Sequence, residues 1–338
     1  MARYVGRVSS TLALALAMIA SGCTGDGAPP PEVDQVQQAV ATAAFTSTYT
    51  GQGAGSTACN TPFAITGQEP TTPGTNPVFL YLIGTGETAT NAAATAAVAS
   101  MASRGFVAAT IAYDSATFNN CAGLQGKARC IFNPGSATSA VAALCGRPGA
   151  DCSKGIVVGG FSQGAVLATQ AKNFDARVQA AWGMGDGVRY TTFFNLSSCQ
   201  ANGNHALPAS RLRAVVGERD QFVGDGFLGI PPGNVAAVRT QLQSLTGASC
   251  AADAFHCLQS SGSGWYIVQN AQAHDGSADH CYMRVSGDCS GSENSLDAGW
   301  LSGTEPWSLG ANLDWLDGFV THGVAVPGPE EQRRGSSW

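Results

Sequence analysis

Charged side chains are scarce in this chain. Only 12% of its 338 residues are Asp, Glu, Lys or Arg, and the formal net charge is −6 at pH 7. The sequence contains no basic run or patch, and nucleic-acid-binding proteins need such clusters to neutralise phosphates. The composition therefore excludes a nucleic-acid partner from our expectations.

The apolar segment near the N-terminus is too short for a stable membrane-spanning helix. It covers Thr11–Ala20, whereas about 20 residues are needed to cross a bilayer. Arg3 and Arg7 precede it, and a positive start before a short apolar core is typical of an export signal. The segment ends in Ala-Ser-Gly-Cys23, which resembles a bacterial lipobox. The resemblance implies cleavage before Cys23, lipidation of its thiol and tethering to a membrane; ordinary secretory cleavage nearby is the alternative.

The chain has no C-x-x-C pair, which argues against a zinc site. It has eleven cysteines, and setting Cys23 aside leaves ten. An even number in an exported chain is typical of disulfides. Closeness in sequence favours four local bridges and leaves one further pair, so we expect Cys121–Cys130, Cys145–Cys152, Cys250–Cys257, Cys281–Cys289 and Cys59–Cys199.

The chain shows no internal repeat, and no linker interrupts it between Cys59 and Val324. We expect a signal peptide of the lipoprotein type at 1–22 and a flexible tether at 23–58, which is rich in Pro, Gly, Ala and Thr. One folded domain then covers 59–324, and a disordered tail follows at 325–338.

Apolar runs alternate with helical patterns through the expected domain. Strands are predicted at 77–83, 105–113, 155–159, 178–184, 212–216 and 265–268, and helices at 89–104, 137–144, 163–172, 234–245 and 309–320. This alternation predicts an α/β fold with a mostly parallel central sheet and helices on both faces.

The most informative stretch is Gly160-Phe-Ser162-Gln-Gly164, which lies between a β-branched run and a helical pattern. This is the nucleophile-elbow pattern G-x-S-x-G in the strand-to-helix context that it requires. The glycines relieve crowding where the strand turns into the helix, and Ser162 is expected in a strained conformation with its hydroxyl exposed. The alternative is a glycine-rich turn with a capping serine, since the chain has 43 glycines.

A nucleophilic serine needs a general base, which an acid must orient. Asp220 comes just after the apolar strand 212–216, so we expect it at the same sheet edge as Ser162. A turn-capping role is the alternative for Asp220. Glu218 and Asp225 are nearby substitutes, and Asp186, after the strand at 178–184, is another candidate acid.

Two of the five histidines, His274 and His280, follow the last predicted strand. We favour His280 as the base because a Cys281–Cys289 bridge would brace its loop, and a general base gains from fixed geometry. His274 is the alternative base. Asp275 and Asp279 lie beside these histidines, but no further ligands are in view, so no metal site is predicted.

An oxyanion hole needs two donors. The backbone N–H of Gln163, which follows the nucleophile, is the first. The second is expected in the loop Ile83-Gly-Thr85-Gly-Glu87 after the first predicted strand, because its glycines allow close backbone approach. The loop has neither a Walker lysine nor the G-x-G-x-x-G spacing of a phosphate loop. A plain glycine turn is the alternative.

With these motifs the chain resembles the α/β-hydrolase superfamily, and around the elbow it resembles the cutinase-like serine esterases. The similar stretches are 82–87, 152–165 and 178–186. The resemblance implies that the Thr85 hydroxyl and Gln163 line the oxyanion hole. Cutinases keep acid and histidine close in sequence, whereas Asp220 and His280 are sixty residues apart. This longer spacing looks more like that of other esterases, lipases and polyester depolymerases of the same fold.

The sequence therefore predicts a secreted, lipid-anchored serine hydrolase of carboxylic esters, with 59–324 as its α/β-hydrolase catalytic domain. Ser162, His280 and Asp220 form the expected triad, and no cofactor is expected. The apolar stretches Tyr190–Leu196 and Asp225–Pro232 would contact an apolar or polymeric substrate or belong to the core. A catalytically inactive binding protein of this fold, and a peptidase or thioesterase, are the alternative functions.

Overall fold

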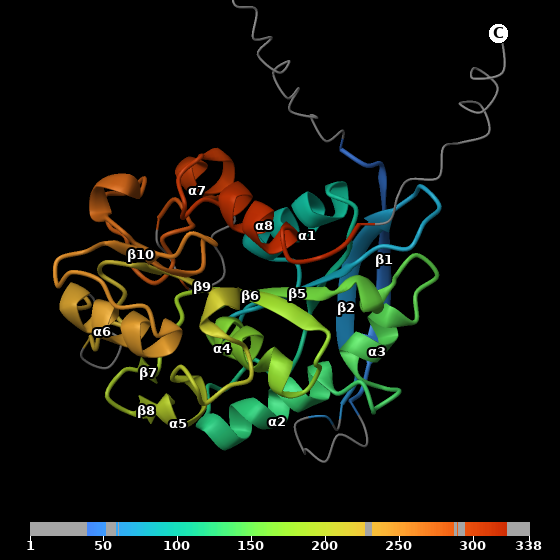
Figure 1. Ribbon diagram of the computed structural model, residues 1–338, viewed down its shortest axis with the longest axis horizontal. Coiled ribbons are helices and arrows are strands. Elements are labelled where there is room, and N and C mark those ends of the chain that lie inside the picture. Colours follow the sequence, from blue (N-terminus) through green and yellow to red (C-terminus); the bar gives the residue numbers. More distant parts are fainter. Residues whose placement is uncertain are drawn as a thin grey trace, which may run out of the picture. The chain divides into compact units, whose positions relative to one another are not determined.

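A nine-stranded sheet forms the centre of the computed structural model (Figure 1). Its strands lie in the order β1 (Thr42–Tyr49), β2 (Phe63–Pro70), β4 (Val107–Ile111), β3 (Val78–Leu82), β5 (Ile156–Phe161), β6 (Val178–Met184), β9 (Leu212–Gly217), β11 (Gly264–Val268) and β10 (His256–Leu258). The six strands from β4 to β11 run parallel. Antiparallel strands flank them at both edges.

The structure describes residues 39–51, 59, 61–226, 232–286, 289 and 295–322. All of them belong to one unit, Gln38–Trp338. The predicted signal peptide, Cys23 and the predicted tail lie outside the described residues. In the part of the chain that the structure describes, no helix combines the length and the apolar character needed to cross a membrane.

Burial explains why the central strands read as unbroken apolar runs. Every residue of β3, β4, β5, β9 and β11 is buried, as expected for parallel strands covered on both faces. The edge strand β1 instead mixes exposed and half-buried residues. The predicted central strands are confirmed.

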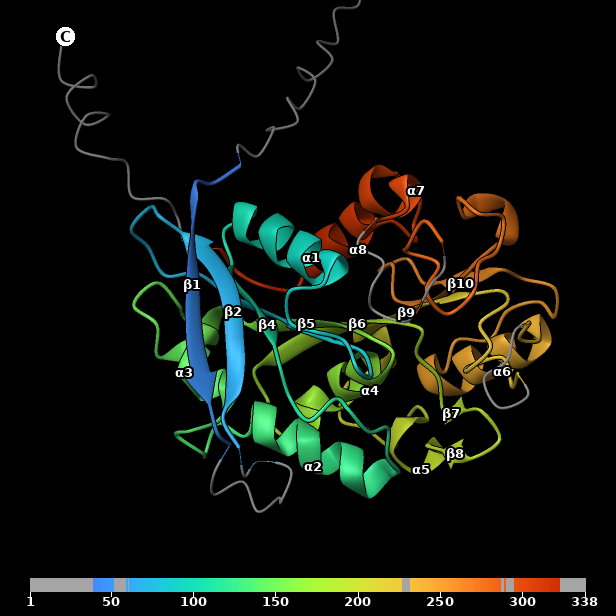
Figure 2. The ribbon, with the colours of Figure 1, turned by 180° about the vertical axis from the view of Figure 1, so that it is seen from behind.

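Helices cover both faces of the sheet (Figures 1 and 2). On one side lie α1 (Ala92–Ser103), α7 (Ala298–Ser302) and α8 (Leu309–Asp317), and on the other side lie α2 (Cys121–Phe132), α4 (Gln163–Gln170), α5 (Ser197–Gln200) and α6 (Val235–Thr246). The chain also forms α3 (Ala140–Cys145), a small hairpin of β7 (Arg189–Tyr190) and β8 (Phe194–Asn195), and the short 3₁₀ helices η2 (Cys152–Lys154), η3 (Ala171–Asn173), η4 (Ala209–Arg211) and η6 (Asn270–Gln272). Together with the strand order and the turn from β5 into α4, this is an α/β-hydrolase fold, as the sequence predicts.

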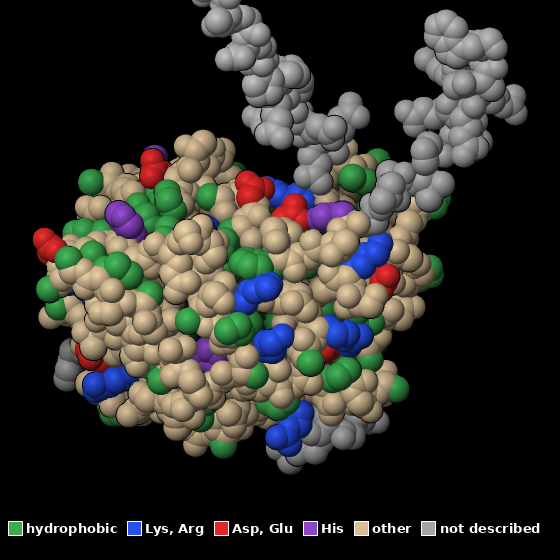
Figure 3. Space-filling view, in the orientation of Figure 1, with side chains coloured by type: hydrophobic (Ala, Val, Ile, Leu, Met, Phe, Trp, Pro, Cys, Tyr) green, Lys and Arg blue, Asp and Glu red, His purple; other side chains and the backbone are tan. Residues whose placement is uncertain are grey.

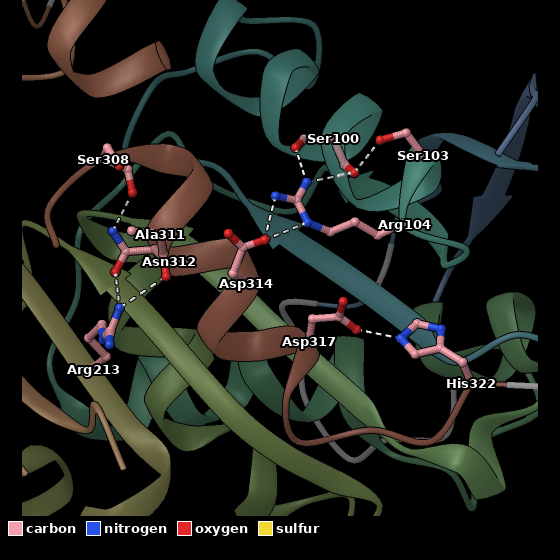
Figure 4. Close-up of polar contacts among 10 residues, drawn as sticks. All are labelled: Ser100, Ser103, Arg104, Arg213, Ser308, Ala311, Asn312, Asp314, Asp317 and His322. Carbon is pink, nitrogen blue, oxygen red and sulfur yellow. Dashed lines mark hydrogen bonds and ion pairs between the residues drawn. The ribbon is translucent and has the colours of Figure 1, made fainter. Parts of the chain in front are cut away.

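The last helix is attached by polar contacts to α1 and to the sheet (Figure 4). The Arg104 guanidinium, at the end of α1, donates to Asp314 Oδ1 at 3.0 and 2.7 Å. From β9, Arg213 donates to the Ala311 carbonyl at 3.2 Å and to Asn312 Oδ1 at 3.4 Å. These bonds fix α8 against elements that lie about one and two hundred residues earlier in the chain.

The sheet begins earlier than the sequence predicts. β1 pairs with β2 over eight residues, so Thr42–Tyr49 is a strand although it lies within the segment 23–58 that we expected to be a tether. This stretch is rich in Ala and Thr, which suits an edge strand, because the side chains there are not covered on both faces of the sheet and need not be strongly apolar. The expectation for this part of the tether is corrected.

Five disulfides join the ten cysteines, and the predicted pairing is right for three of them. Cys145–Cys152, Cys250–Cys257 and Cys281–Cys289 are confirmed. The other two are wrong, because the structure pairs Cys59 with Cys130 and Cys121 with Cys199. Cys121 and Cys130 stand nine residues apart on α2, a rise of about 13 Å, which a disulfide cannot span.

Charged side chains are thinly scattered over the face of the molecule seen in Figure 3. This view agrees with the low charged fraction of the sequence.

Candidate active site

Ser162 stands alone between β5 and α4 in a strained backbone conformation. Its φ is 53° and its ψ is −119°, which side-chain-bearing residues rarely adopt. Its N–H donates to the Met184 carbonyl on β6 at 2.8 Å. The side chain makes no helix-capping hydrogen bond, so the structure contradicts the alternative of a capping serine.

The two glycines of the motif are required by close backbone contacts. A Cβ at position 160 would lie 2.4 Å from the Gly164 carbonyl oxygen, and one at position 164 would lie 2.1 Å from that of Leu82. Neither neighbour is a flexible side chain, so no larger residue fits at either place. The strand, the helix and the end of β3 thus converge at Ser162.

Asp220 is completely buried in the loop after β9. Its Oδ1 accepts hydrogen bonds from the backbone N–H groups of Phe222 and Val223, both at 2.9 Å. Its Oδ2 lies 2.6 Å from Nδ1 of His280. Three such partners satisfy the hydrogen-bonding capacity of the buried carboxylate and fix its orientation.

His280 is 3% exposed and is fixed on several sides. Its ring lies between those of Phe161 and Phe222, with centroids 4.9 and 4.7 Å away. A Cβ at Gly185, where φ is +62°, would lie 2.6 Å from His280 Cε1. Directly after the histidine, Cys281 is bridged to Cys289. With Nδ1 engaged by Asp220, the other ring nitrogen, Nε2, is the one available for chemistry.

The structure places the alternative base away from this pair. His274 is exposed, and its backbone N–H donates to Asp297 Oδ2 at 2.7 Å. It does not line the pocket that contains Ser162. Of the two histidines after β11, the structure thus brings only His280 to Asp220.

The substitute acids have other partners. Asp186 is buried and accepts from the Thr169 hydroxyl at 2.9 Å and the Gly187 N–H at 2.8 Å. Burial raises its pKa to about 7. Glu218 accepts from the Asn270 side chain.

Asp225, the third substitute, lies 3.4 Å from Arg189. In the described part of the chain none of these three carboxylates makes a hydrogen bond or ion pair with a histidine, and Asp220 is the candidate acid that the structure brings to one.

The predicted oxyanion residues lie together beside the elbow. The Gln163 side-chain amide donates to Thr85 Oγ1 at 2.9 Å. The loop that carries Thr85 is held by a hydrogen bond from Gly86 N–H to the Ser115 carbonyl at 3.1 Å. The Gln163 N–H, directly after Ser162, and the Thr85 hydroxyl, which lines the same cavity as Ser162, are the candidate donors for a developing negative charge.

Sequence reasoning missed a buried ion pair at this site. Glu87 and Arg284 form it, and their side chains are 4% and 2% exposed. The other oxygen of Glu87 accepts from the Gly84 N–H at 2.7 Å. Burial raises the pKa of Glu87, while the Gly84 N–H and Arg284 act in the opposite direction. Glu87 belongs to the loop Gly84-Thr-Gly-Glu87, in which the second oxyanion donor is expected. No local sequence pattern points to Arg284, about two hundred residues later.

A cavity of about 270 Å³ opens on Ser162. Polar side chains and the disulfide-bonded Cys289 share its lining with aromatic rings. The polar residues are Thr85, Glu87, Ser162, Thr191 and His280, and the aromatic ones are Phe118, Phe161, Tyr190, Phe194 and Phe222. The stretch Tyr190–Leu196 therefore contributes to the pocket. Most of the second apolar stretch, Asp225–Pro232, lies outside the described residues. Among the residues with described positions, no three His, Cys, Asp or Glu side chains gather into a metal site.

No known protein family model and no curated protein matches the chain. Among solved structures it is similar to esterase Est22, with 14% identity, a TM-score of 0.36 and coverage of 53% of this chain and 63% of that one. A ferulic acid esterase from Streptomyces cinnamoneus is 16% identical, with a TM-score of 0.33 and coverage of 53% and 65%. A hypothetical protein from Pseudomonas aeruginosa is 16% identical, with a TM-score of 0.34 and coverage of 48% and 46%. The chain thus spans less than two thirds of the length of each of these proteins.

Proposed function

We propose that this chain is a serine hydrolase that cleaves carboxylic esters. The proposal depends on two rare features that lie in the same pocket. One is a strained serine at a strand-to-helix elbow, and the other is a buried histidine whose Nδ1 lies 2.6 Å from a buried aspartate. Both Ser162 and His280 line the cavity of about 270 Å³.

In the proposed mechanism, Ser162 Oγ attacks the acyl carbon and its proton passes to His280 Nε2. Asp220 holds the imidazole in the tautomer with Nδ1–H and stabilises the imidazolium that forms. His280 then gives the proton to the departing alkoxide, which leaves an acyl-enzyme. Water then gives a proton to His280 Nε2 and attacks the acyl carbon, the bond to Ser162 Oγ breaks, the proton returns to Ser162, and the carboxylic acid is released. The Gln163 N–H and the Thr85 hydroxyl stabilise both oxyanions.

The lining of the pocket supports an uncharged, apolar acyl group. Five aromatic rings contribute to it, and Glu87, its one charged residue besides the titratable His280, is neutralised by Arg284. The Thr85–Gln163 arrangement beside the elbow supports the cutinase-like resemblance. Small apolar esters and exposed ends of polyester chains are the substrates we propose.

We also propose that the protein is exported and tethered through a lipid on Cys23. Five disulfides in the folded part support an oxidising compartment. Incorporation of a labelled fatty acid into the parent and its loss in Cys23→Ser test the anchor. A Cys23→Ser protein that still takes up the label would rule it out.

Hydrolysis of p-nitrophenyl acetate and butyrate by the parent and by Ser162→Ala tests the proposed activity. We expect turnover in the parent only. An inactive binding protein would give no turnover and no reaction with a fluorophosphonate. A peptidase or thioesterase would react with the fluorophosphonate but turn over peptides or thioesters in preference to the esters.

A further inference from the structure

The side chain of Gln163 is fully buried and joins a lysine to the oxyanion loop. Its Oε1 accepts from Lys127 Nζ at 3.0 Å. Its Nε2 donates to Thr85 Oγ1 at 2.9 Å and to the Thr117 carbonyl at 3.1 Å. Lys127 Nζ also donates to the Thr117 carbonyl, at 2.6 Å.

Donor and acceptor chemistry gives this chain of bonds a direction. An ammonium group has no acceptor, so the amide atom that faces Lys127 must be the oxygen. The NH₂ group of Gln163 must then face Thr85, whose oxygen accepts from it. A hydroxyl that already accepts this bond still has its own hydrogen to donate, and Thr85 lines the cavity that contains Ser162.

We infer that Lys127 is a positioning residue for the oxyanion hole: together with the Thr117 carbonyl it fixes the orientation of the Gln163 amide, and it thereby keeps the Thr85 hydroxyl as a donor toward the substrate. The inference rests on the proposed function, and it assigns Lys127 no contact with substrate. If the amide were reversed, its oxygen would accept the Thr85 hydroxyl and divert that donor from the oxyanion.

The surroundings of Lys127 agree with a dedicated role. It lies on α2, its side chain is 3% exposed, and the nearest carboxylate, Asp114, is 4.0 Å away and 46% exposed. Burial lowers the pKa of the lysine, which marks a cost of keeping this charge inside. A buried lysine without a close carboxylate partner is rare unless its hydrogen bonds serve a structural or functional role.

A double-mutant cycle on ester hydrolysis by the full chain tests the inference. Thr85→Val removes the hydroxyl donor and should lower kcat about 10²-fold. Lys127→Met should lower kcat by about 5- to 30-fold and change KM by less than about 3-fold, because the lost interaction acts in the transition state. In the Thr85→Val background, Lys127→Met should change kcat by less than about 2-fold, because the lysine acts through Thr85. Equal losses in both backgrounds would overturn the inference.

Matched variants separate positioning from general damage. Lys172→Met removes a half-buried lysine that also donates to backbone carbonyls, and it should leave kcat unchanged. Thr85→Ser keeps a hydroxyl and should retain most of the parental kcat.

If Lys127→Met does not fold, Gln163→Glu gives the second route. Its carboxylate can only accept, so it should capture the Thr85 hydroxyl and lower kcat about as far as Thr85→Val does. A Gln163→Glu protein with parental kcat would overturn the inference.

The two proposals fail differently. A folded parent without esterase activity, unaffected by Ser162→Ala, would remove the proposed function. An active parent with independent effects of Lys127 and Thr85 would remove only the role of Lys127.

Discussion

The two walls of the pocket are held by different means. The nucleophile wall consists of the loop 82–87 and the elbow 160–164, and it depends on close backbone contacts of the elbow with Leu82 and Met184. The histidine wall consists of the loops 218–223 and 278–286 with Cys289, and it depends on the Asp220–His280 contact and on the Cys281–Cys289 bridge. The difference teaches that the proposed nucleophile is positioned by backbone packing, whereas the proposed base is positioned by side-chain contacts and a disulfide.

The largest expected effect comes from the histidine wall. His280→Ala should lower kcat/KM for p-nitrophenyl butyrate about 10⁴-fold, because it removes the proton acceptor. His274→Ala, the matched control, removes an exposed histidine and should change kcat/KM by less than about 3-fold. Steady-state kinetics on both variants checks this, and the reverse ranking would make His274 the base.

The ion pair Glu87–Arg284 joins the two walls, so breaking it should disturb both. Arg284→Met leaves a buried, uncompensated carboxylate and should lower the free energy of unfolding by about 3–5 kcal/mol. The double variant Glu87→Gln/Arg284→Met leaves no buried charge there and should be more stable than Arg284→Met. Urea denaturation of the parent, Arg284→Met and the double variant measures this, and a double variant no more stable than Arg284→Met would contradict the account.

A buried carboxylate behind the nucleophile wall should make stability depend on pH. Burial raises the pKa of Asp186 from 3.8 to about 7, so the native state binds the proton more tightly than the unfolded chain does. The contribution of Asp186 to stability is therefore greatest below about pH 4, falls as the pH rises from about 4 to about 7, and levels off above it.

Asp186→Asn should remove this loss. Its advantage over the parent in unfolding free energy should grow by about 1.4 kcal/mol per pH unit between about pH 4 and 7, to a total of about 4 kcal/mol. Urea denaturation from pH 4.5 to 8.5 checks this. An advantage equal at both ends of the range would show that Asp186 titrates alike in both states.

The smallest expected effect distinguishes two disulfides of nearly equal loop length. Cys281–Cys289 and Cys145–Cys152 close 8 and 7 residues, and replacing either pair by serines should cost about 2–3 kcal/mol of stability. Only the first pair braces His280, so only its loss should lower kcat, by about 5- to 10-fold. Thermal unfolding and kcat of both double variants test this, and equal kcat values would mean that the bridge does not position the histidine.

The sequence predicted best what depends on local pattern. The buried parallel strands appear as apolar runs, and the elbow around Ser162 has its own motif, so both were predictable. The Asp220–His280 contact was predictable because both residues follow strands whose carboxyl ends share an edge of the sheet.

What the sequence did not reveal depends on distant partners. The predicted Cys121–Cys130 bridge is incompatible with a helix between these two cysteines. The helix α2, which carries Lys127, was therefore not predicted. The edge strand β1 has too few apolar residues to stand out from a tether. Arg284 carries no local signal, because its role comes from Glu87 on the other wall.

Fluorophosphonate labelling with peptide mapping tests the central claim most directly, since only an activated serine reacts rapidly. The account predicts stoichiometric labelling of the parent at Ser162 and parental rates in His274→Ala. Labelling should be lost in Ser162→Ala and at least about 100-fold slower in His280→Ala. A folded, oxidised parent that does not react, or a label on another residue, would contradict the assignment of Ser162 as the nucleophile.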